Sequence, residues 1–416
     1  MLAFAQPSFL RAADFDAAAA ANQVGLALYR HLAPSKPDDN FVLSPYSIES
    51  ALALVYAGAD GETRAEMARV LHLPSDDQTV RSGFGELHSA FDAIATRTEN
   101  TAKERRRDGG AVDPIEWHEA NRLFGQQGYA FRDSFLNLVN DGYAAPFAPL
   151  DFKHAAENAR TTINDWVANQ TKHRIDEVVP DGGVNARTRL VLVNAIYLKA
   201  PWQDPFEKDD TEPRPFYSAG GASRNVPTMI KTADLGYAKE SNLTVVALNY
   251  LDRDLQFLIL LADKGRSPEA VAAKLTADDF ARWSKIGEGN KTLVALYLPR
   301  FHVESGTIPL GASLRALGMK SAFDEPAGSA NFDRIAPRKP GDYLALSDVF
   351  HDTFIALNED GTEAAAATVG VVLSTFAVAA KPPKPVEVRV DRPFLFAIQH
   401  RASGVCLFLG RVTDPR

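Results

Sequence analysis

Residues 358–385 read NEDGTEAAAATVGVVLSTFAVAAKPPKP, and the rest of the chain is best understood around this stretch. Its acidic start leads to Gly361, and residues 364–380 then carry no charge. A run of this kind, closed by a segment rich in lysine and proline, is too apolar for an ordinary surface loop. It is also too short and too plain for a membrane span, which needs about 20 strongly apolar residues.

Two local structures remain open for this stretch. Thr362 and Glu363 before four alanines form a good helix start, whereas the later valines favour a strand. In a strand, successive side chains point to opposite faces, so the uncharged run would present two different faces. One face would carry only small or β-branched residues, namely Thr362, Ala364, Ala366, Thr368, Gly370, Val372 and Ser374. Such a face suits a segment that slides between existing strands, and the alternative is an alanine-rich linker with a frayed helix.

The composition is that of a large globular protein. The 416 residues could form two or three average domains or one large domain, and 45% of them are hydrophobic, enough for a sizeable core. The net charge of -8 and the pI of about 5.7 argue against a general nucleic-acid-binding protein, because phosphate groups require a basic surface. No transmembrane segment is predicted.

The N-terminus and the single cysteine leave the compartment open. Residues 1–15, MLAFAQPSFLRAADF, lack the basic start and long apolar core of a signal peptide, although Ala3-Phe4-Ala5 fits the end of a clipped one. Cys406 is the only cysteine, so no intrachain disulfide can form. Its apolar surroundings predict a buried, inert thiol.

The first half of the sequence is mainly helical. Apolar residues at helical spacing predict helices over 16–32, 44–57, 62–71, 83–95, 131–142 and 159–171, with short strands over 40–43 and 120–124. The charged stretch 99–113, which includes Arg105, Arg106 and Arg107, predicts a solvated loop, with a polyanion site as the alternative.

The second half is mainly β-strand. Residues 190–198, LVLVNAIYL, are nearly all apolar, which is typical of a strand covered on both faces, and their one polar residue, Asn194, must find partners inside the sheet. Residues 344–357 mix apolar residues with His351 and lead directly into the stretch 358–385. Further strands are predicted over 244–248, 255–261, 293–301, 386–390, 394–399 and 406–412, with a helix over 308–317. With no linker and no repeat, this order favours one α+β domain over residues 1–416.

No recognised catalytic or cofactor-binding motif occurs. The chain has no G-x-S-x-G, H-E-x-x-H, P-loop or C-x-x-C pattern, and His118-Glu119 lacks the second histidine of a zinc site. The nine histidines are scattered and no acid pair stands out. The sequence therefore predicts a protein that is not an enzyme and holds neither a metal nor a cofactor.

Several stretches, in order along the chain, match the pattern of one known family. They are NFVLSPYSI (40–48), NRLFG (121–125), INDWV (163–167), LVNAIYL (192–198), Trp202 with Phe206, PRF (299–301), LRALGMKSAF (314–323), EDGTEAAAAT (359–368) and RPFLF (392–396). On these residues the chain resembles the serpins, or serine protease inhibitors, from about residue 22 to residue 415. The resemblance implies three β-sheets, eight or nine helices and an exposed reactive-centre loop over 358–385, with residues 1–15 as a flexible extension.

The resemblance also implies suicide inhibition of a serine endopeptidase. In the family, the target protease attacks the loop and forms an acyl-enzyme, and the cut loop inserts into the central sheet and distorts the protease. Such inhibitors are monomers that act outside the cell or in the periplasm, and a cytoplasmic location stays open because no clear signal peptide is present. A cysteine protease is a second kind of target that the resemblance allows.

The hinge of the family is matched along the start of the loop. Gly361 corresponds to the position that absorbs the change from strand to loop, which glycine tolerates, and Thr362 to the residue buried first. The matching positions are Glu359, Gly361, Thr362, Glu363, Ala364, Ala365, Ala366, Ala367 and Thr368. Non-inhibitory relatives, whose role as chaperone or carrier is the alternative function, tend to have charged or bulky residues here. The intact hinge favours an inhibitor.

The family's spacing from the hinge implies a reactive bond at Thr375-Phe376. A threonine before the bond points to an elastase-like protease, whereas cleavage one residue later, at Phe376-Ala377, would point to a chymotrypsin-like one. The chain departs from the family here, because residues 376–392 form a longer segment with two lysines and three prolines.

Five further residues match positions inside the family's fold. Trp202 corresponds to the point where the loop first enters the central sheet. The other four correspond to a hydrogen-bonded shutter beneath the central strands, and they are Ser44, Ser47, Asn194 and His351. The alternative is that all five are ordinary core residues with no part in opening the sheet.

Overall fold

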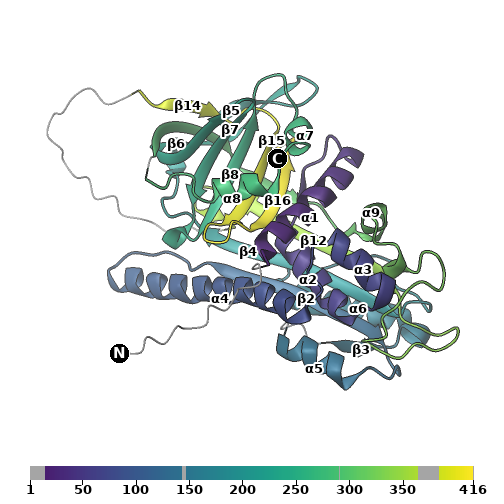
Figure 1. Cartoon of the computed structure of the whole chain (residues 1–416). Helices are drawn as coiled ribbons and strands as arrows, with labels where there is room; N and C mark the ends of the chain where they lie inside the picture. Colours follow the sequence, from purple (N-terminus) through teal and green to yellow (C-terminus); the bar gives the residue numbers. More distant parts are fainter. Residues whose placement is uncertain (1–14, 143–146, 290, 364–383, 416) are drawn as a thin grey trace, which may run out of the picture.

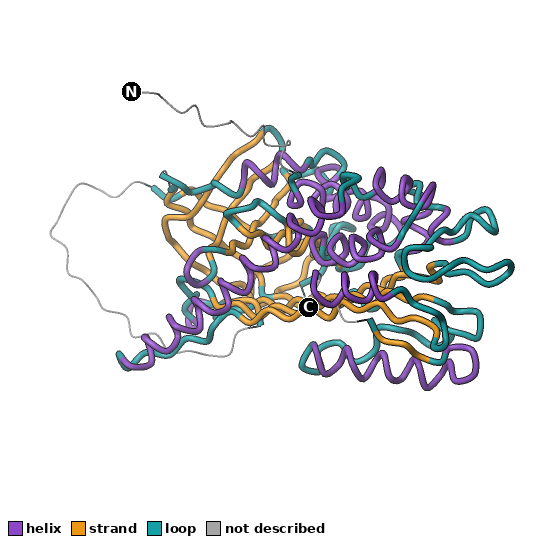
Figure 2. Tube along the Cα trace, turned by 60° about the horizontal axis from the view of Figure 1, so that its bottom comes forward, coloured by secondary structure: helices purple, strands orange, loops and turns teal. Residues whose placement is uncertain are grey.

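The computed structural model describes residues 15–142, 147–289, 291–363 and 384–415. Most of the predicted N-terminal extension and residues 364–383, which include the predicted reactive bond at Thr375, Phe376 or Ala377, lie outside the described residues. Helices cover both faces of a long central sheet, and a second group of strands lies at one end of it (Figures 1 and 2). Among the described helices, none combines the length and apolarity needed to cross a bilayer.

The part of the chain that the structure describes contains nine α-helices. They are α1 (Ala17–Leu32), α2 (Pro45–Gly58), α3 (Gly61–Val70), α4 (Asp77–Arg107), α5 (Asp133–Gly142), α6 (Phe152–Gln170), α7 (Pro268–Ala272), α8 (Ala277–Trp283) and α9 (Gly311–Ala316). The start of α2 has the predicted chemistry, because the Ser44 side chain accepts a hydrogen bond from the Ser47 amide and Pro45 occupies the first turn. All but one of the residues of α2 are buried, as its apolar sequence predicted.

The prediction of a solvated loop over 99–113 is wrong as far as Arg107. α4 continues to that residue, because Thr98 and Ala102 extend its buried face and Lys103 forms an ion pair with Glu99 one turn away, at 2.7 Å. Arg105, Arg106 and Arg107 therefore lie in the last turn of a 31-residue helix, where positive charge is favourable to the helix dipole. The buried residues keep their helical spacing into the charged stretch, which was not recognised in the sequence.

Within the part of the chain that the structure describes, the central sheet has seven strands. In sheet order they are β10 (Phe301–Glu304), β12 (Leu346–Leu357), β13 (Gly361–Thr362), β4 (Leu190–Pro201), β2 (Glu116–Gln126) and β3 (Ala148–Leu150), and β11 (Ile308–Pro309) pairs with β12. The helix predicted over 308–317 is therefore too long, since its first two residues form β11. Leu310 then leads into α9.

The other strands form one hydrogen-bonded network that contains two sheets. Its order is β1 (Phe41–Leu43), β16 (Cys406–Val412), β15 (Phe394–His400), β8 (Leu255–Ala262), β7 (Leu243–Asn249), β6 (Ser223–Glu240), β9 (Thr292–Pro299) and β14 (Val386–Arg389), with β5 (Glu212–Tyr217) beside β6. The long β6, which the sequence did not predict, pairs with β9 over 228–235 and with β7 over 236–240. Because β6 passes from one sheet to the next, the fold has the three sheets that the resemblance implied.

Two hydrophobic cores cover the two faces of the central sheet. The larger one joins its inner face to α1, α2 and the strands that include Cys406, a buried residue whose burial raises the pKa of the thiol. The smaller one lies under α6 on the outer face and includes Phe152, Ile163 and Phe350. Both faces of β4 are therefore buried, as its continuous apolar sequence predicted.

Candidate functional site

The pair of strands β12 and β4 is open at one end. From Leu346 opposite Leu190 to Thr353 opposite Ile196, the two strands pair directly and in parallel. Beyond that point β13 lies between them and pairs antiparallel with both, with Thr362 opposite Leu357 of β12 and opposite Ala200 of β4. The first two residues after the turn at 358–360 thus already occupy the place of a new central strand.

Only glycine fits at the first position of β13. Gly361 has φ 149, and a Cβ atom there would collide with the carbonyl oxygen of Ala200. The turn before it is closed by the Asn358 side chain, whose Oδ1 accepts hydrogen bonds from the amides of Asp360 and Gly361 at 2.9 and 3.2 Å. Gly361 therefore lies directly after the turn that reverses the chain from β12 into β13, and its predicted role as the hinge between strand and loop stays a prediction.

Thr362 is completely buried, and its hydroxyl group contacts one member of an aromatic stack. That hydroxyl group shares a hydrogen bond with the Tyr250 hydroxyl, and the Tyr250 ring stacks on Trp202 with ring centroids 4.6 Å apart. The Trp202 ring nitrogen in turn donates to the Asn358 carbonyl oxygen at 3.0 Å. Trp202 therefore lies where the chain enters the sheet.

Two charged residues fix the two sides of β13. Glu359 is buried and accepts from Arg300, at 2.6 Å, and from Thr211. Burial alone would raise the pKa of this carboxyl, but the two hydrogen bonds hold it below its usual value. On the other side, Glu363 has a left-handed backbone at φ 50 and pairs with Arg174, and burial raises its pKa. The regular strand ends at Thr362 because the chain turns out of the sheet at Glu363.

The four predicted shutter residues form one buried network on the inner face. The Ser44 amide donates to Nε2 of His351 at 3.1 Å, so Nδ1 carries the proton and donates to Asn194 Oδ1. The Asn194 amide group donates to the Ser47 hydroxyl at 2.6 Å and to Asn121. Burial lowers the pKa of His351 to about 3, so the ring is neutral at neutral pH. The network ties α2 to β4 and β12 where these strands pair directly.

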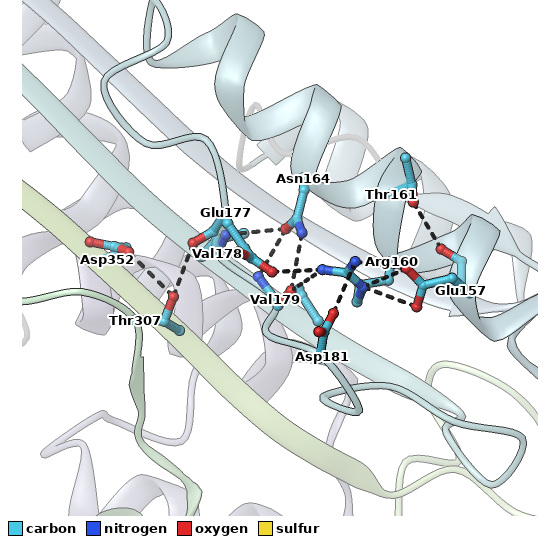
Figure 3. Close-up of polar contacts among 10 residues, drawn as sticks. All are labelled: Glu157, Arg160, Thr161, Asn164, Glu177, Val178, Val179, Asp181, Thr307 and Asp352. Atoms are coloured by element: carbon cyan, nitrogen blue, oxygen red, sulfur yellow. Dashed lines mark hydrogen bonds and ion pairs between the residues drawn. The ribbon is translucent and has the colours of Figure 1, made fainter.

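A second polar cluster lies on the outer face of the same strands, and the sequence did not predict it (Figure 3). The Asn164 side chain of α6 binds the segment that returns from α6 towards β4, accepting from the amides of Val178 and Val179 at 3.1 and 2.9 Å. Arg160 pairs with Glu157, Glu177 and Asp181.

The same cluster reaches down to the central strand. The Thr307 hydroxyl lies 3.1 Å from the carbonyl oxygen of Glu177 and 3.3 Å from Oδ2 of Asp352 on β12 (Figure 3). The return segment is therefore linked to the strand pair that it covers. We call the cluster of Arg160, Asn164, Glu177, Thr307 and Asp352 the α6 clamp.

The remaining predicted positions fall elsewhere. Ala364, Ala365, Ala366, Ala367 and Thr368 lie outside the described residues, as do the residues of the reactive bond. The described residues contain no group of histidine, cysteine and acidic side chains that could hold a metal ion.

The comparisons with known proteins cover almost the whole chain. The family model described as "Serpin (serine protease inhibitor)" matches residues 19–415. The leukocyte elastase inhibitor of Sus scrofa is 35% identical over 403 residues, covering 95% of this chain and 99% of the relative. The plasminogen activator inhibitor 2 of Homo sapiens is 34% identical over 415 residues, covering 94% of this chain and 97% of the relative.

Solved structures agree with the sequence comparisons. The crystal structure of uncleaved ovalbumin superposes with a TM-score of 0.80 and 26% sequence identity, and it covers 96% of this chain and 100% of its own. The relatives are named as protease inhibitors and not as enzymes. On the family match, the identity and the fold, this chain belongs to the serpin family of serine protease inhibitors.

Proposed function

We propose that the chain is an irreversible suicide inhibitor of a serine endopeptidase with elastase-like specificity. The protease attacks the reactive-centre loop, forms an acyl-enzyme, and is trapped when the cut loop continues β13 down between β12 and β4. The single observation that carries this proposal is the open end of the strand pair, at which Thr362 is already paired with both β12 and β4 and Gly361 is paired with β4.

The registers of the two strands support continuation without a slip as far as Asp348 of β12 and Val191 of β4. Each residue added after Thr362 moves one residue back along β12 and one back along β4. Thr368 then comes opposite His351 on one side and Asn194 on the other, and these two residues are themselves partners in the direct pairing of β12 with β4. A new strand can therefore satisfy both neighbours at once, and it enters through the shutter.

The side chains of the loop suit this path. Every second residue after Thr362 shares its face, which packs against the buried inner side of the sheet. Those residues are Ala364, Ala366, Thr368, Gly370, Val372 and Ser374. All are small or β-branched, so they meet little steric resistance, and insertion can compete with hydrolysis of the acyl-enzyme.

The length of the opening supports the assignment of the reactive bond. Counted in the same way, Leu346 and Leu190, the first residues of β12 and β4, come opposite residues 373 and 372. They differ by one residue because the pairing of β12 with β4 shifts register between Leu346 and Asp348. A bond at Thr375-Phe376 lies just beyond that end, so cleavage there frees enough chain to fill the whole opening. The threonine before the bond suits a protease with a small specificity pocket. An elastase-like target also agrees with the relatives that are named elastase inhibitors.

The test is to incubate the protein with pancreatic-type elastase and with chymotrypsin and to examine the mixtures by denaturing electrophoresis. We expect a complex with elastase that survives SDS, and N-terminal sequencing of the released fragment should begin at Phe376. A fragment that begins at Ala377 would move the bond and favour a chymotrypsin-like target. Loop cleavage without any complex, with every protease tested, would refute inhibition and favour a chaperone or carrier.

A further inference from the structure

Asp352 is a buried acid at the place where the central strands must separate. Asp352 is 5% exposed and lies opposite Ala195 of β4 in the sheet. Because side chains alternate along a strand, Asp352 faces α6 while its neighbour His351 faces the shutter on the other side. Phe350, two residues earlier, confirms the direction, since it belongs to the core under α6.

The contacts of Asp352 depend on a proton. The Thr307 hydroxyl has one hydrogen but two acceptors in reach, the Glu177 carbonyl oxygen and the Asp352 carboxyl group. With Asp352 protonated, the carboxyl donates to Thr307 and Thr307 donates to Glu177, so both bonds form. With Asp352 ionised, the single hydrogen is drawn to the carboxylate, and the Glu177 carbonyl oxygen loses this donor.

The charges around Asp352 do not favour its ionised form. Within the described residues it has no ion pair, and the charged group that acts on it is Glu304 from β10. The return segment presents the backbone carbonyl oxygen of Glu177 to Thr307, while the Glu177 carboxylate points to Arg160 (Figure 3). Arg160, the nearest positive charge of the α6 clamp, is paired with Glu157, Glu177 and Asp181. Burial first, and then the charge of Glu304, raise the pKa of Asp352 to about 7, against the opposing hydrogen bonds of Thr307 and Thr353.

We propose that Asp352 is a positioning residue for loop insertion: its proton completes the bridge through Thr307 that holds the return segment of α6 on β12, and loss of the proton releases it. Released, the segment no longer restrains the separation of β12 from β4. The inference rests on the proposed function, because insertion between these strands is the step that it controls. The loop should therefore insert faster above neutral pH than below it.

The test uses insertion without a protease. A synthetic peptide with the sequence of residues 362–375, TEAAAATVGVVLST, is incubated with the intact protein at about pH 6 and about pH 8, and its incorporation is followed by the rise in melting temperature of samples returned to one pH. The ionised fraction of a group with a pKa of about 7 changes roughly tenfold between these values, so we expect roughly tenfold faster incorporation at the higher pH.

Three variants give a pattern that a merely structural role would not. Asp352→Asn keeps a donor to Thr307 at every pH and should incorporate the peptide slowly at both values. Thr307→Val removes the bridge and should incorporate it rapidly at both values. Glu304→Gln is the matched control, since removing a neighbouring charge should lower the midpoint of the pH profile without abolishing it.

Each outcome decides the question. Equal rates in the wild type at both pH values, or an unchanged pH profile in Asp352→Asn, would overturn the proposal, and Thr307→Val decides it if the first variant fails to fold. The failure of the proposed function is visible separately. A protein that incorporates the peptide in this pH-dependent way but forms no SDS-stable complex would support the role of Asp352 and refute the proposed inhibition.

Discussion

The two ends of the β12–β4 pair are built in opposite ways. At the open end, Gly361 and Thr362 already separate the strands, and the contacts around them, from Trp202, Tyr250 and Arg300, hold the inserted backbone in place. At the closed end the strands pair directly, with the shutter on one face and the α6 clamp on the other. If the cut loop inserts as proposed, this difference places the resistance to insertion at the closed end, where polar networks on both faces would have to be broken.

The largest expected effect comes from filling the closed end altogether. A strand of ~15 residues gains hydrogen bonds worth ~0.5–1.5 kcal/mol each, on the order of 10–20 kcal/mol in total, which equals the net stability of a whole domain. We therefore expect protein nicked in the loop to melt at least ~20 °C higher than the intact protein in matched thermal scans. Equal melting temperatures would mean that no such energy is stored in the intact form.

A large side chain at the open end should stop insertion before it reaches the closed end. Thr362→Arg places a long, charged side chain where the threonine is fully buried against Tyr250, which should expel β13 and leave the cut loop outside. Roughly 100-fold more inhibitor should then be consumed as cleaved substrate per protease trapped, measured by titration of residual protease activity. Thr362→Ser, which keeps the hydroxyl group, is the control and should inhibit normally. Unchanged inhibition in the arginine variant would refute the order of insertion.

The fold followed from the sequence where the pattern was local. The helix that begins at Pro45 and the strand that begins at Leu190 were predicted because a capping serine and a continuous apolar run carry their own signal. β6 was missed because its exposed and buried residues alternate irregularly as it passes from one sheet to the next. The last turns of α4 were missed because a charge run looks the same on a helix as in a loop.

In the candidate site too, residues with a local sequence signal were predicted from the residues alone, and residues defined by distant contacts were not. Asn194 stood out as a lone polar residue in an apolar strand. Its partners Ser47 and His351 came only from the resemblance and Asn121 was not predicted, since all three lie more than seventy residues away in the sequence. Nothing local marks Asp352, because one acid in a strand is normally a solvent-facing residue. Its burial depends on α6 and on Thr307, and contacts of that kind cannot be read from spacing.

A buried acid on α2, close to the shutter, should lower the free energy of unfolding of the intact protein at neutral pH. Glu49 is completely buried two residues after Ser47, its carboxyl oxygens have no hydrogen-bond partner among the described residues, and burial raises its pKa well above the usual value. With a raised pKa, stability is complete below the unfolded value of about 4.3 and is lost as pH rises towards the folded value.

The size of this effect can be measured with one isosteric change. Glu49→Gln should raise the free energy of unfolding at pH 7 and change it much less at pH 4, as determined in urea. Glu62→Gln, at an exposed acid on α3, is the control and should change little. A stability gain that is equal at both pH values would show that the proton on Glu49 is not its source.

The smallest effect is hidden in the wild type, because neighbouring residues on the two faces of the closed end titrate in opposite directions. His351 has a folded pKa of about 3, below the unfolded value of about 6.5, so its contribution is complete above 6.5 and is lost as pH falls, by about 2 kcal/mol between pH 7 and pH 5. Asp352 has a folded pKa of about 7, above the unfolded value of about 3.9, so its contribution grows as pH falls, by about 2 kcal/mol over the same interval. The two slopes nearly cancel, and urea unfolding of the wild type should change little from these two groups.

Single variants should separate the two faces. Asp352→Asn leaves the histidine slope, so its free energy of unfolding should fall by about 2 kcal/mol relative to the wild type between pH 7 and pH 5. His351→Gln leaves the acid slope and should rise by a similar amount, while His173→Gln, at an exposed position, should follow the wild type. If both variants kept the wild-type profile, neither residue would titrate as its burial requires. If only one of the two pH slopes appeared, it would identify the face of the closed end at which protonation affects stability. The role proposed for Asp352 stands only if the slope that belongs to Asp352 is observed.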